Sequence, residues 1–232
     1  MGIKKGLYLL EDTGSQQVQL IGSGVILREV QKAAAILRAE FNISANVWSA
    51  TSFNELTRDA MACDHYNRLH PMDEQKVPYI TEQLAKHGGI VVAATDYMRS
   101  FSEQVRAWIP DNRPYTTLGT DGFGRSDSRV KLRDFFGVDA AHIVVATLKM
   151  LADEGEVEPR LVKDAISSLG LDTDQTPPWY PRVYSDTADV PPIPAKEVTP
   201  NPVPNIKEEE DEAISSENKA EDGADAGIVD KK

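Results

Sequence analysis

Apolar residues recur along the first three quarters of the chain with two different periods. Short, nearly unbroken apolar runs predict strands, because parallel strands are buried on both faces; they occupy 18–21, 45–52, 89–96 and 115–121. Other segments repeat apolar residues every three or four positions or are helix-prone, and they predict helices over 26–41, 53–69, 78–88, 97–109, 128–136, 140–155 and 158–170. Strands that alternate with helices predict a three-layer α/β/α domain with a mainly parallel sheet.

Composition divides the chain into three parts. From 177 to the C-terminus, 13 acidic residues accompany 6 basic ones, so this stretch carries −7 of the net charge of −12, and it also holds 9 of the 14 prolines. Such a composition cannot bury enough apolar surface to fold. We therefore expect a lead-in segment at 1–17, the α/β domain at 18–175 and a disordered, proline-rich acidic tail at 176–232.

The charge and the cysteine content exclude several functions. A mildly acidic domain lacks the basic face with which nucleic-acid binders displace counterions, so we expect no nucleic-acid partner. Cys63 is the only cysteine, which rules out an internal disulfide and is typical of a reducing, cytoplasmic setting. The apolar runs are too short for a signal peptide or a bilayer-spanning helix. The sequence thus predicts a soluble cytoplasmic protein with no membrane contact.

A Gly-x-Gly turn, Gly22-Ser23-Gly24, follows the first predicted strand and opens a helix. Backbone N–H groups in this arrangement can bind phosphate. The dinucleotide-binding fingerprint needs a third glycine, however, and Leu27 takes that position. The acidic residue that should end the next strand is missing as well. A tight strand-to-helix turn is the better interpretation.

The histidines and the cysteine form no recognisable metal motif. Cys63, His65 and His70 lie within eight residues, but their spacing places them on no common helix face. His142 falls on an apolar helix, where a structural role is the usual one. We therefore expect no metal site at these positions.

Several long segments together resemble one known family. They are GSGVILREVQKAAAIL, NVWSATSFNELTRDAMACDHYNRLHP, ATDYMRSFSEQVRAWIP and LGTDGFGRSDSRVKLRDFFGVDAAHIVVATL, and the similarity extends over about residues 3–175. The segments resemble the C-terminal domain of homodimeric bacterial pyruvate dehydrogenase decarboxylating components, which belong to the transketolase-like, thiamine diphosphate-dependent family.

The resemblance implies a three-domain enzyme of which this chain matches only the third. In that family the first domain binds the diphosphate and Mg²⁺, the second binds the aminopyrimidine, and the third supports the dimer without a cofactor ligand. Thr120-Asp121-Gly122 resembles only half of the Mg²⁺ motif, since Thr120 replaces its leading glycine and no asparagine pair follows. We therefore expect no catalytic residue, and no thiamine diphosphate or Mg²⁺ bound by this chain alone.

The glycine-rich stretch 119–129 is the candidate site. Ser126 or Asp127 is placed to cap the helix that starts at 128, and Gly122 and Gly124 suit backbone with positive φ. The loop should lie at the carboxyl edge of the sheet, where α/β domains place their sites. The expected interdomain or interface loop consists of Asp121, Arg125, Ser126, Asp127 and Arg129.

In the complete enzyme, Arg125 and Arg129 would contact the neighbouring domain or subunit. The resemblance implies three partners: the upstream domains of the enzyme, the second subunit of a homodimer, and the lipoyl acyltransferase that receives the acetyl group formed from pyruvate. Two stand-alone alternatives remain. One is an anion-sensing module that uses 22–24 or 119–124, and the other is an interaction module whose acidic tail binds basic partners.

Overall fold

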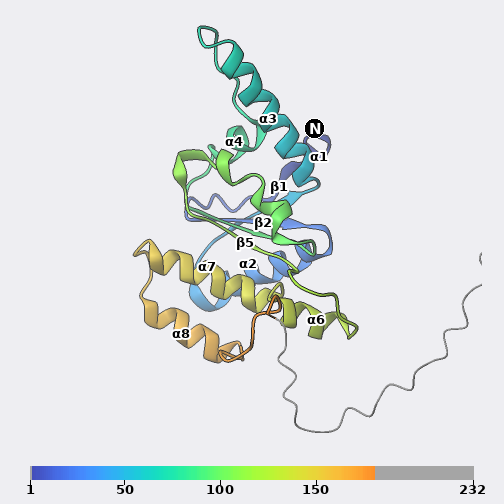
Figure 1. Cartoon of the computed structure of the whole chain (residues 1–232). Helices are drawn as coiled ribbons and strands as arrows, with labels where there is room; N and C mark the ends of the chain where they lie inside the picture. Colours follow the sequence, from blue (N-terminus) through green and yellow to red (C-terminus); the bar gives the residue numbers. More distant parts are fainter. Residues whose placement is uncertain (1, 181–232) are drawn as a thin grey trace, which may run out of the picture. The chain divides into compact units, whose positions relative to one another are not determined.

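The computed structural model describes residues 2–180, and their strands form one five-stranded sheet (Figure 1). The strand order is β1-β3-β2-β4-β5. The bounds are Leu7–Glu11 for β1, Val18–Ser23 for β2, Asn46–Ala50 for β3, Ile90–Ala94 for β4 and Tyr115–Leu118 for β5. β2 to β5 run parallel, and β1 is antiparallel to β3. The prediction of a mainly parallel sheet is confirmed. The predicted tail lies outside the described residues from 181 onward.

Helices cover both faces of the sheet (Figure 1). One face is covered by α2 (Leu27–Phe41), α7 (Ala140–Asp153) and α8 (Pro159–Ser168), and the other by α3 (Phe53–Leu69), α4 (Tyr79–Leu84) and α5 (Arg99–Glu103). Alternate strand residues supply the two cores, because successive side chains point to opposite faces. Leu20 packs into the core with α2 and α7, whereas Ile21 packs into the core with α3 and α4. The three-layer prediction is confirmed.

Two short helices lie outside these layers. Helix α1 (Gly2–Lys5) precedes β1, and α6 (Arg129–Phe136) follows the loop after β5. The lead-in segment therefore contributes α1 and β1, and β1 forms an edge of the sheet through pairs such as Leu9 with Trp48. This edge strand was not predicted from the sequence pattern.

The helix predicted at 97–109 is divided. It becomes α5 and a short 3-10 helix, η2 (Arg106–Trp108), and a second, η3 (Pro110–Asn112), follows directly. The interruption lets Arg106 donate a hydrogen bond to the Tyr115 carbonyl on β5 (2.6 Å). The helix predicted at 78–88 is also shorter, because α4 ends at Leu84. At 97–109 a contact with the sheet thus accompanies the break in the helical pattern, whereas after α4 the Arg113 guanidinium donates to the carbonyls of Leu84 (2.7 Å) and His87 (2.5 Å).

A buried polar network holds the turn between β1 and β2 against the sheet. The Asn46 side chain accepts hydrogen bonds from the N–H groups of Thr13 (2.8 Å) and Ser15 (3.3 Å) and donates to the Ser15 carbonyl (2.9 Å). The Gln19 side-chain oxygen accepts from Asn46 (3.1 Å) and from the Trp48 indole (2.9 Å). Buried amides are costly unless satisfied, so this network fixes the path by which the lead-in segment joins the domain.

One helical stretch, Arg129–Asp153, is long and apolar enough to cross a membrane by length and composition alone. It consists of α6 and α7, which are separated at Gly137, where the backbone is left-handed (φ 65°). Helix α7 buries Ile143, Val144 and Leu148 in the core beneath the sheet. The apolar composition of this stretch is therefore explained by a core helix.

Candidate functional site

The loops that follow the parallel strands meet at one edge of the sheet, which we call the carboxyl edge. The chain passes from β2 to β3 on one side of β2 and then to β4 on its other side, so the strand order reverses at β2. Open α/β sheets bind ligands outside the carboxyl ends of their strands at such a switch point. Residues 24–26 follow β2, 95–98 follow β4 and 119–128 follow β5. The carboxyl edge is therefore the candidate functional site.

Asp121 and Thr120 anchor the glycine-rich loop to its neighbour. The Asp121 carboxylate accepts a hydrogen bond from the Arg99 N–H (3.0 Å) and pairs with the Arg99 guanidinium. The Thr120 hydroxyl donates to the Asp96 carbonyl (2.7 Å), and the Thr120 N–H donates to the Tyr97 carbonyl (2.9 Å). These contacts join the loops after β4 and β5 into one surface.

Gly122 brings this loop close to the last described segment. It has a positive φ of 104°, as predicted, and a Cβ built on it would lie 2.4 Å from the Pro178 carbonyl oxygen. Gly124 does not adopt a positive φ, so that prediction is wrong. A Cβ there would meet no heavy atom of the described residues within 4 Å.

Ser128 caps α6, and the prediction that Ser126 or Asp127 would do so is wrong. The Ser128 hydroxyl accepts a hydrogen bond from the Lys131 N–H (3.4 Å). Asp127 instead accepts from the Ser128 N–H (2.7 Å) and lies 4.0 Å from the Lys131 amino group. Three consecutive polar residues all suit a helix cap, and pattern alone does not choose between them.

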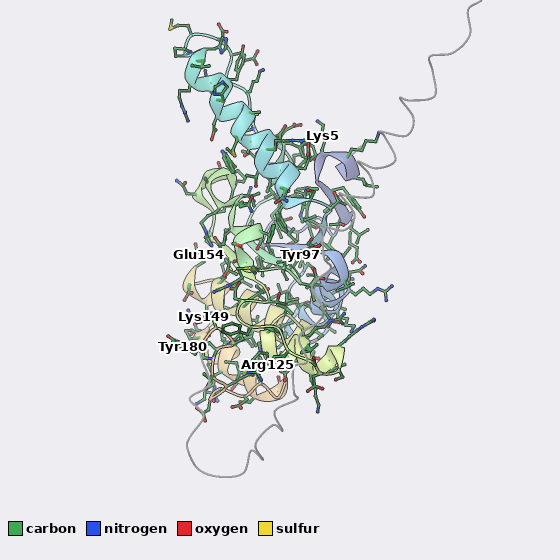
Figure 2. All side chains as sticks on the ribbon, turned by 45° about the vertical axis from the view of Figure 1, so that its right-hand side comes forward. Lys5, Tyr97, Arg125, Lys149, Glu154 and Tyr180 are labelled. Carbon is green, nitrogen blue, oxygen red and sulfur yellow. The ribbon has the colours of Figure 1, made fainter. Side chains whose placement is uncertain are left out.

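Arg125 and Arg129 line a cavity of about 450 Å³ at the carboxyl edge. Figure 2 marks Arg125 on the loop that leads into α6. Its guanidinium lies 4.0 Å from the centre of the Phe135 ring, which restricts the side chain. Within residues 2–180 neither arginine forms an ion pair with a carboxylate. Their contact with a neighbouring domain stays a prediction.

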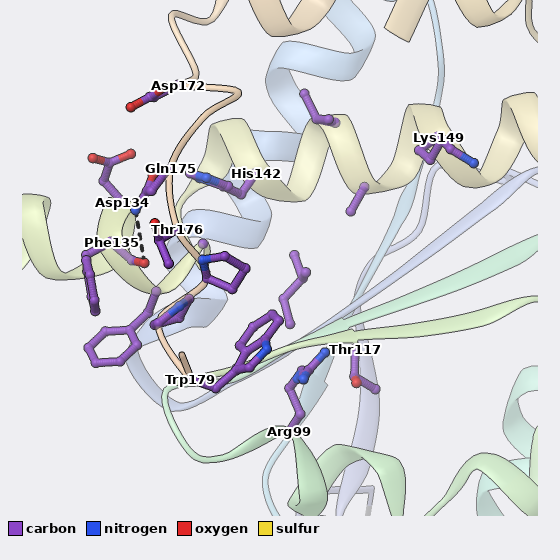
Figure 3. A pocket seen from close by; sticks show the side chains of 18 residues that line it. Arg99, Thr117, Asp134, Phe135, His142, Lys149, Asp172, Gln175, Thr176 and Trp179 are labelled. Atoms are coloured by element: carbon purple, nitrogen blue, oxygen red, sulfur yellow. Dashed lines mark hydrogen bonds between the residues drawn. The ribbon is translucent and has the colours of Figure 1, made fainter. Parts of the chain in front are cut away.

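A second cavity, of about 410 Å³, lies beside β5. Figure 3 shows Trp179 next to Arg99, whose guanidinium is 4.8 Å from the centre of the indole ring. Two cationic side chains line the cavity, and both are already paired, Arg99 with Asp121 and Lys149 with Asp153. This cavity therefore offers less to a charged ligand than the one at the carboxyl edge.

Three possible metal ligands that are not grouped by a sequence motif come together in the fold. One ligand atom from each of Asp134, Asp139 and His142 lies within 4.8 Å of the others, and Zn²⁺ accepts such ligands. Asp139, however, caps α7: it accepts from the His142 N–H (3.0 Å) and lies 2.8 Å from the His142 Nδ1. Burial would raise the pKa of Asp139, but the hydrogen bonds from His142 outweigh it and lower this pKa below its usual range. The proximity of Asp139 and His142 is thus explained by helix capping, which the spacing D-x-x-H could have indicated.

The other sequence candidates have structural roles. A Cβ on Gly22 would lie 2.7 Å from the Leu27 Cα, so the Gly-x-Gly turn allows α2 to pack closely on β2. Cys63 is buried on α3, and burial, together with the nearby Asp59, raises the pKa of its thiol. His70 lies at the C-terminal end of α3, and its ring stacks on that of Tyr66 with 4.1 Å between the ring centres.

Comparisons with known proteins place these features in a family. Residues 6–139 match the family described as the transketolase-like TK C-terminal domain. The chain is 52% identical over 180 residues to the pyruvate dehydrogenase E1 component of Pseudomonas aeruginosa and 49% identical over 179 residues to that of Escherichia coli K12. Each alignment covers 76% of this chain and 20% of the relative, so the chain spans about one fifth of the length of these relatives.

Among solved structures, a transketolase from Leishmania mexicana is 19% identical, with a TM-score of 0.44, over 66% of this chain and 19% of that one. The family match begins at residue 6, just before β1, and extends to the start of α7, so it includes every described strand. This chain belongs to the transketolase-like C-terminal domain family.

Proposed function

We propose that this chain serves as the C-terminal domain of a pyruvate dehydrogenase E1-type enzyme and acts through assembly. The observation that carries the proposal is its 52% identity to such a component across 76% of the chain. By the family resemblance, the complete enzyme is a cytoplasmic homodimer that uses thiamine diphosphate and Mg²⁺ to decarboxylate pyruvate and transfers the acetyl group to a lipoyl acyltransferase.

The residues of the carboxyl edge do not fit a Mg²⁺–diphosphate unit. Asp121 is the carboxylate of the motif-like stretch 120–122, and it is engaged by both the backbone N–H and the guanidinium of Arg99. A cation at this carboxylate would displace or oppose the guanidinium. We therefore assign no catalytic or cofactor-binding role to this chain, and the thiamine chemistry belongs to the upstream domains of the complete enzyme.

The carboxyl edge has the composition of an interface. Exposed apolar side chains occur on all three of its loops: Val25 is 56% exposed, Tyr97 59%, Met98 55% and Phe123 87%. Arg125 and Arg129 lie among them. Aromatic residues, methionine and arginine are enriched at protein–protein interfaces and supply much of the binding energy there. This supports a role of the loop 119–129 in contacting a neighbouring domain or subunit.

The assembly role is tested in a complete enzyme. We would replace the matching segment of the Pseudomonas aeruginosa relative by residues 6–180 of this chain and compare it with the double variant Arg125→Glu, Arg129→Glu. The expected result is a weaker dimer by analytical ultracentrifugation and a lower pyruvate-dependent dye reduction. Arg160→Glu, an exposed arginine on α8, is the matched control and should change neither measurement.

Two outcomes would contradict the proposal. An unaltered dimer and unaltered activity in the double variant would show that the carboxyl edge contacts nothing that matters for assembly. Appreciable pyruvate turnover by the purified 232-residue chain would show that the chain itself carries catalytic groups.

A further inference from the structure

The cavity at the carboxyl edge lies at the switch point of the sheet. Val25 and Ile26 follow β2, Asp96 follows β4, and Thr120 and Gly122 follow β5, and all of them line it. Its volume of about 450 Å³ falls within the roughly 300–1,000 Å³ that small-molecule sites occupy. The position and the size are therefore those of a ligand site.

The three arginines on one wall of this cavity differ in whether they already form an ion pair. Arg125, Arg129 and Arg133 recur every four residues and all line the cavity. Arg133 is already paired, because its guanidinium lies 2.7 Å from the buried carboxylate of Glu29, which also pairs with Lys32 at 2.9 Å. Arg125 and Arg129 form no ion pair within the described residues. Two arginines that form no ion pair within residues 2–180 therefore line the same cavity.

Apart from the arginines, the polar residues that line the cavity are Thr120 and the carboxylate-bearing Asp96. The apolar lining residues are Val25, Ile26, Leu132, Phe136 and Val138. Asp96 also lines the cavity and comes from the loop after β4, not from the arginine-bearing loop and helix. An anionic group is thus favoured near the arginines and disfavoured near Asp96. This difference in charge sets the orientation of a bound anionic ligand.

We propose that this cavity binds a small organic phosphate, with the phosphate on Arg125 and Arg129 and an apolar body against the aliphatic wall. Guanidinium groups bind phosphate oxygens in a bidentate manner, and two of them match the charge of a dianion. The Arg125 guanidinium lies 4.0 Å from the centre of the Phe135 ring, which is outside the lining of this cavity, and this contact limits its motion. Residues 2–180 alone form this cavity, so the proposal is tested on the separate chain, whereas in an assembled enzyme a docked domain would compete with the ligand for the same two arginines.

The experiment is a titration of the full 232-residue chain with phenyl phosphate, followed by backbone NMR shifts and calorimetry. Three further compounds test the parts of phenyl phosphate separately. Inorganic phosphate has the anion without an apolar body, benzoate has the ring with a monoanion, and benzyl alcohol has the apolar body without a charge. We expect phenyl phosphate to bind roughly tenfold more tightly than each of them, because it uses both the arginines and the wall. The largest amide shifts should occur near residues 25, 96 and 120–125.

Variants locate the site. Arg129→Gln and Arg125→Gln should each weaken phenyl phosphate binding by roughly fivefold to tenfold, since each removes a charge-assisted contact. Val25 lines the cavity from the loop after β2 and is exposed. Val25→Glu places a negative charge beside the bound anion, so it should weaken binding without disturbing the core. Arg160→Gln, on α8, is the control and should bind like the parent chain.

Each contrary outcome overturns the proposal. Equal binding of benzoate and phenyl phosphate would exclude phosphate selectivity, and equal binding of inorganic phosphate would exclude the apolar wall. Unchanged affinity in both arginine variants and in Val25→Glu would place any binding elsewhere. Because Arg125, Arg129 and Val25 are exposed, unfolding of all three variants is not expected, and thermal melts check that each is folded.

Discussion

Asp121 and Arg99 connect the loops that follow two adjacent parallel strands. The carboxylate of Asp121 accepts the Arg99 backbone N–H at 3.0 Å and also pairs with the Arg99 guanidinium. The Arg99 guanidinium in turn lies against the Trp179 ring, 4.8 Å from its centre. Three segments that are far apart in the sequence thus depend on one aspartate, which itself is only 17% exposed in its side chain.

Removal of this carboxylate should loosen the carboxyl edge. Asp121→Ala is expected to lower the free energy of unfolding by about 2 kcal/mol, because two hydrogen bonds to a charged group are lost. Asp121→Asn should cost about half as much, since its amide oxygen can still accept the Arg99 N–H. Urea denaturation measures both. Glu154→Gln, at an exposed turn, serves as the control, and equal stability of Asp121→Ala and this control would refute the anchoring role.

The pH dependence of stability should include a contribution from Asp139. Hydrogen bonds from His142 keep the pKa of Asp139 lower in the folded chain than in the unfolded chain. The unfolded chain therefore binds more protons in acid, so this contribution is fully present above the unfolded-state pKa of about 4 and is lost as the pH falls through the lower folded-state value.

Two variants separate the charge of Asp139 from its cap. Asp139→Asn keeps a good helix cap, whereas Asp139→Ala removes the cap and should cost about 1 kcal/mol more at neutral pH. Both should flatten the loss of stability below about pH 4. Asp164→Asn, on α8 with 66% of its side chain exposed, should retain the parent profile. An unchanged acid profile in Asp139→Asn would show that its carboxylate does not contribute.

Gly22 should be sensitive to the smallest possible side chain. Gly22→Ala places a Cβ 2.7 Å from the Leu27 Cα, which is backbone and cannot move independently. We expect a loss of about 2 kcal/mol in unfolding free energy, in the range of overpacked cores. Gly124→Ala is the matched control, because its Cβ would meet no heavy atom of residues 2–180 within 4 Å and the position needs no positive φ. It should change stability by less than about 0.5 kcal/mol, and similar costs in the two variants would exclude the packing explanation.

The regular elements were predictable because their apolar residues have a clear period. The strands from β2 to β5 and most helices follow from such patterns, and α3 has the predicted bounds of 53–69. β1 was missed because Leu7–Glu11 is a short apolar run whose partner, β3, lies almost forty residues later. An antiparallel edge strand of this kind depends on pairing, which leaves no local period.

The site was only partly predictable. The position of the loop after a strand indicated the carboxyl edge, and the structure places Asp121, Arg125 and Arg129 there. The pairing of Asp121 with Arg99 and that of Arg133 with Glu29 join residues 22 and 104 positions apart. Sequence spacing contains no signal for such partners, so which arginine remains unpaired could be learned only from the fold.

Strand β2 has a consequence for how the carboxyl edge behaves. All six of its residues are buried, and it is hydrogen-bonded to a parallel neighbour on each side. A strand in that position exchanges its amide protons only when the whole domain opens. Residues 24–26, which leave this strand, therefore start from a firmly held position at the carboxyl edge.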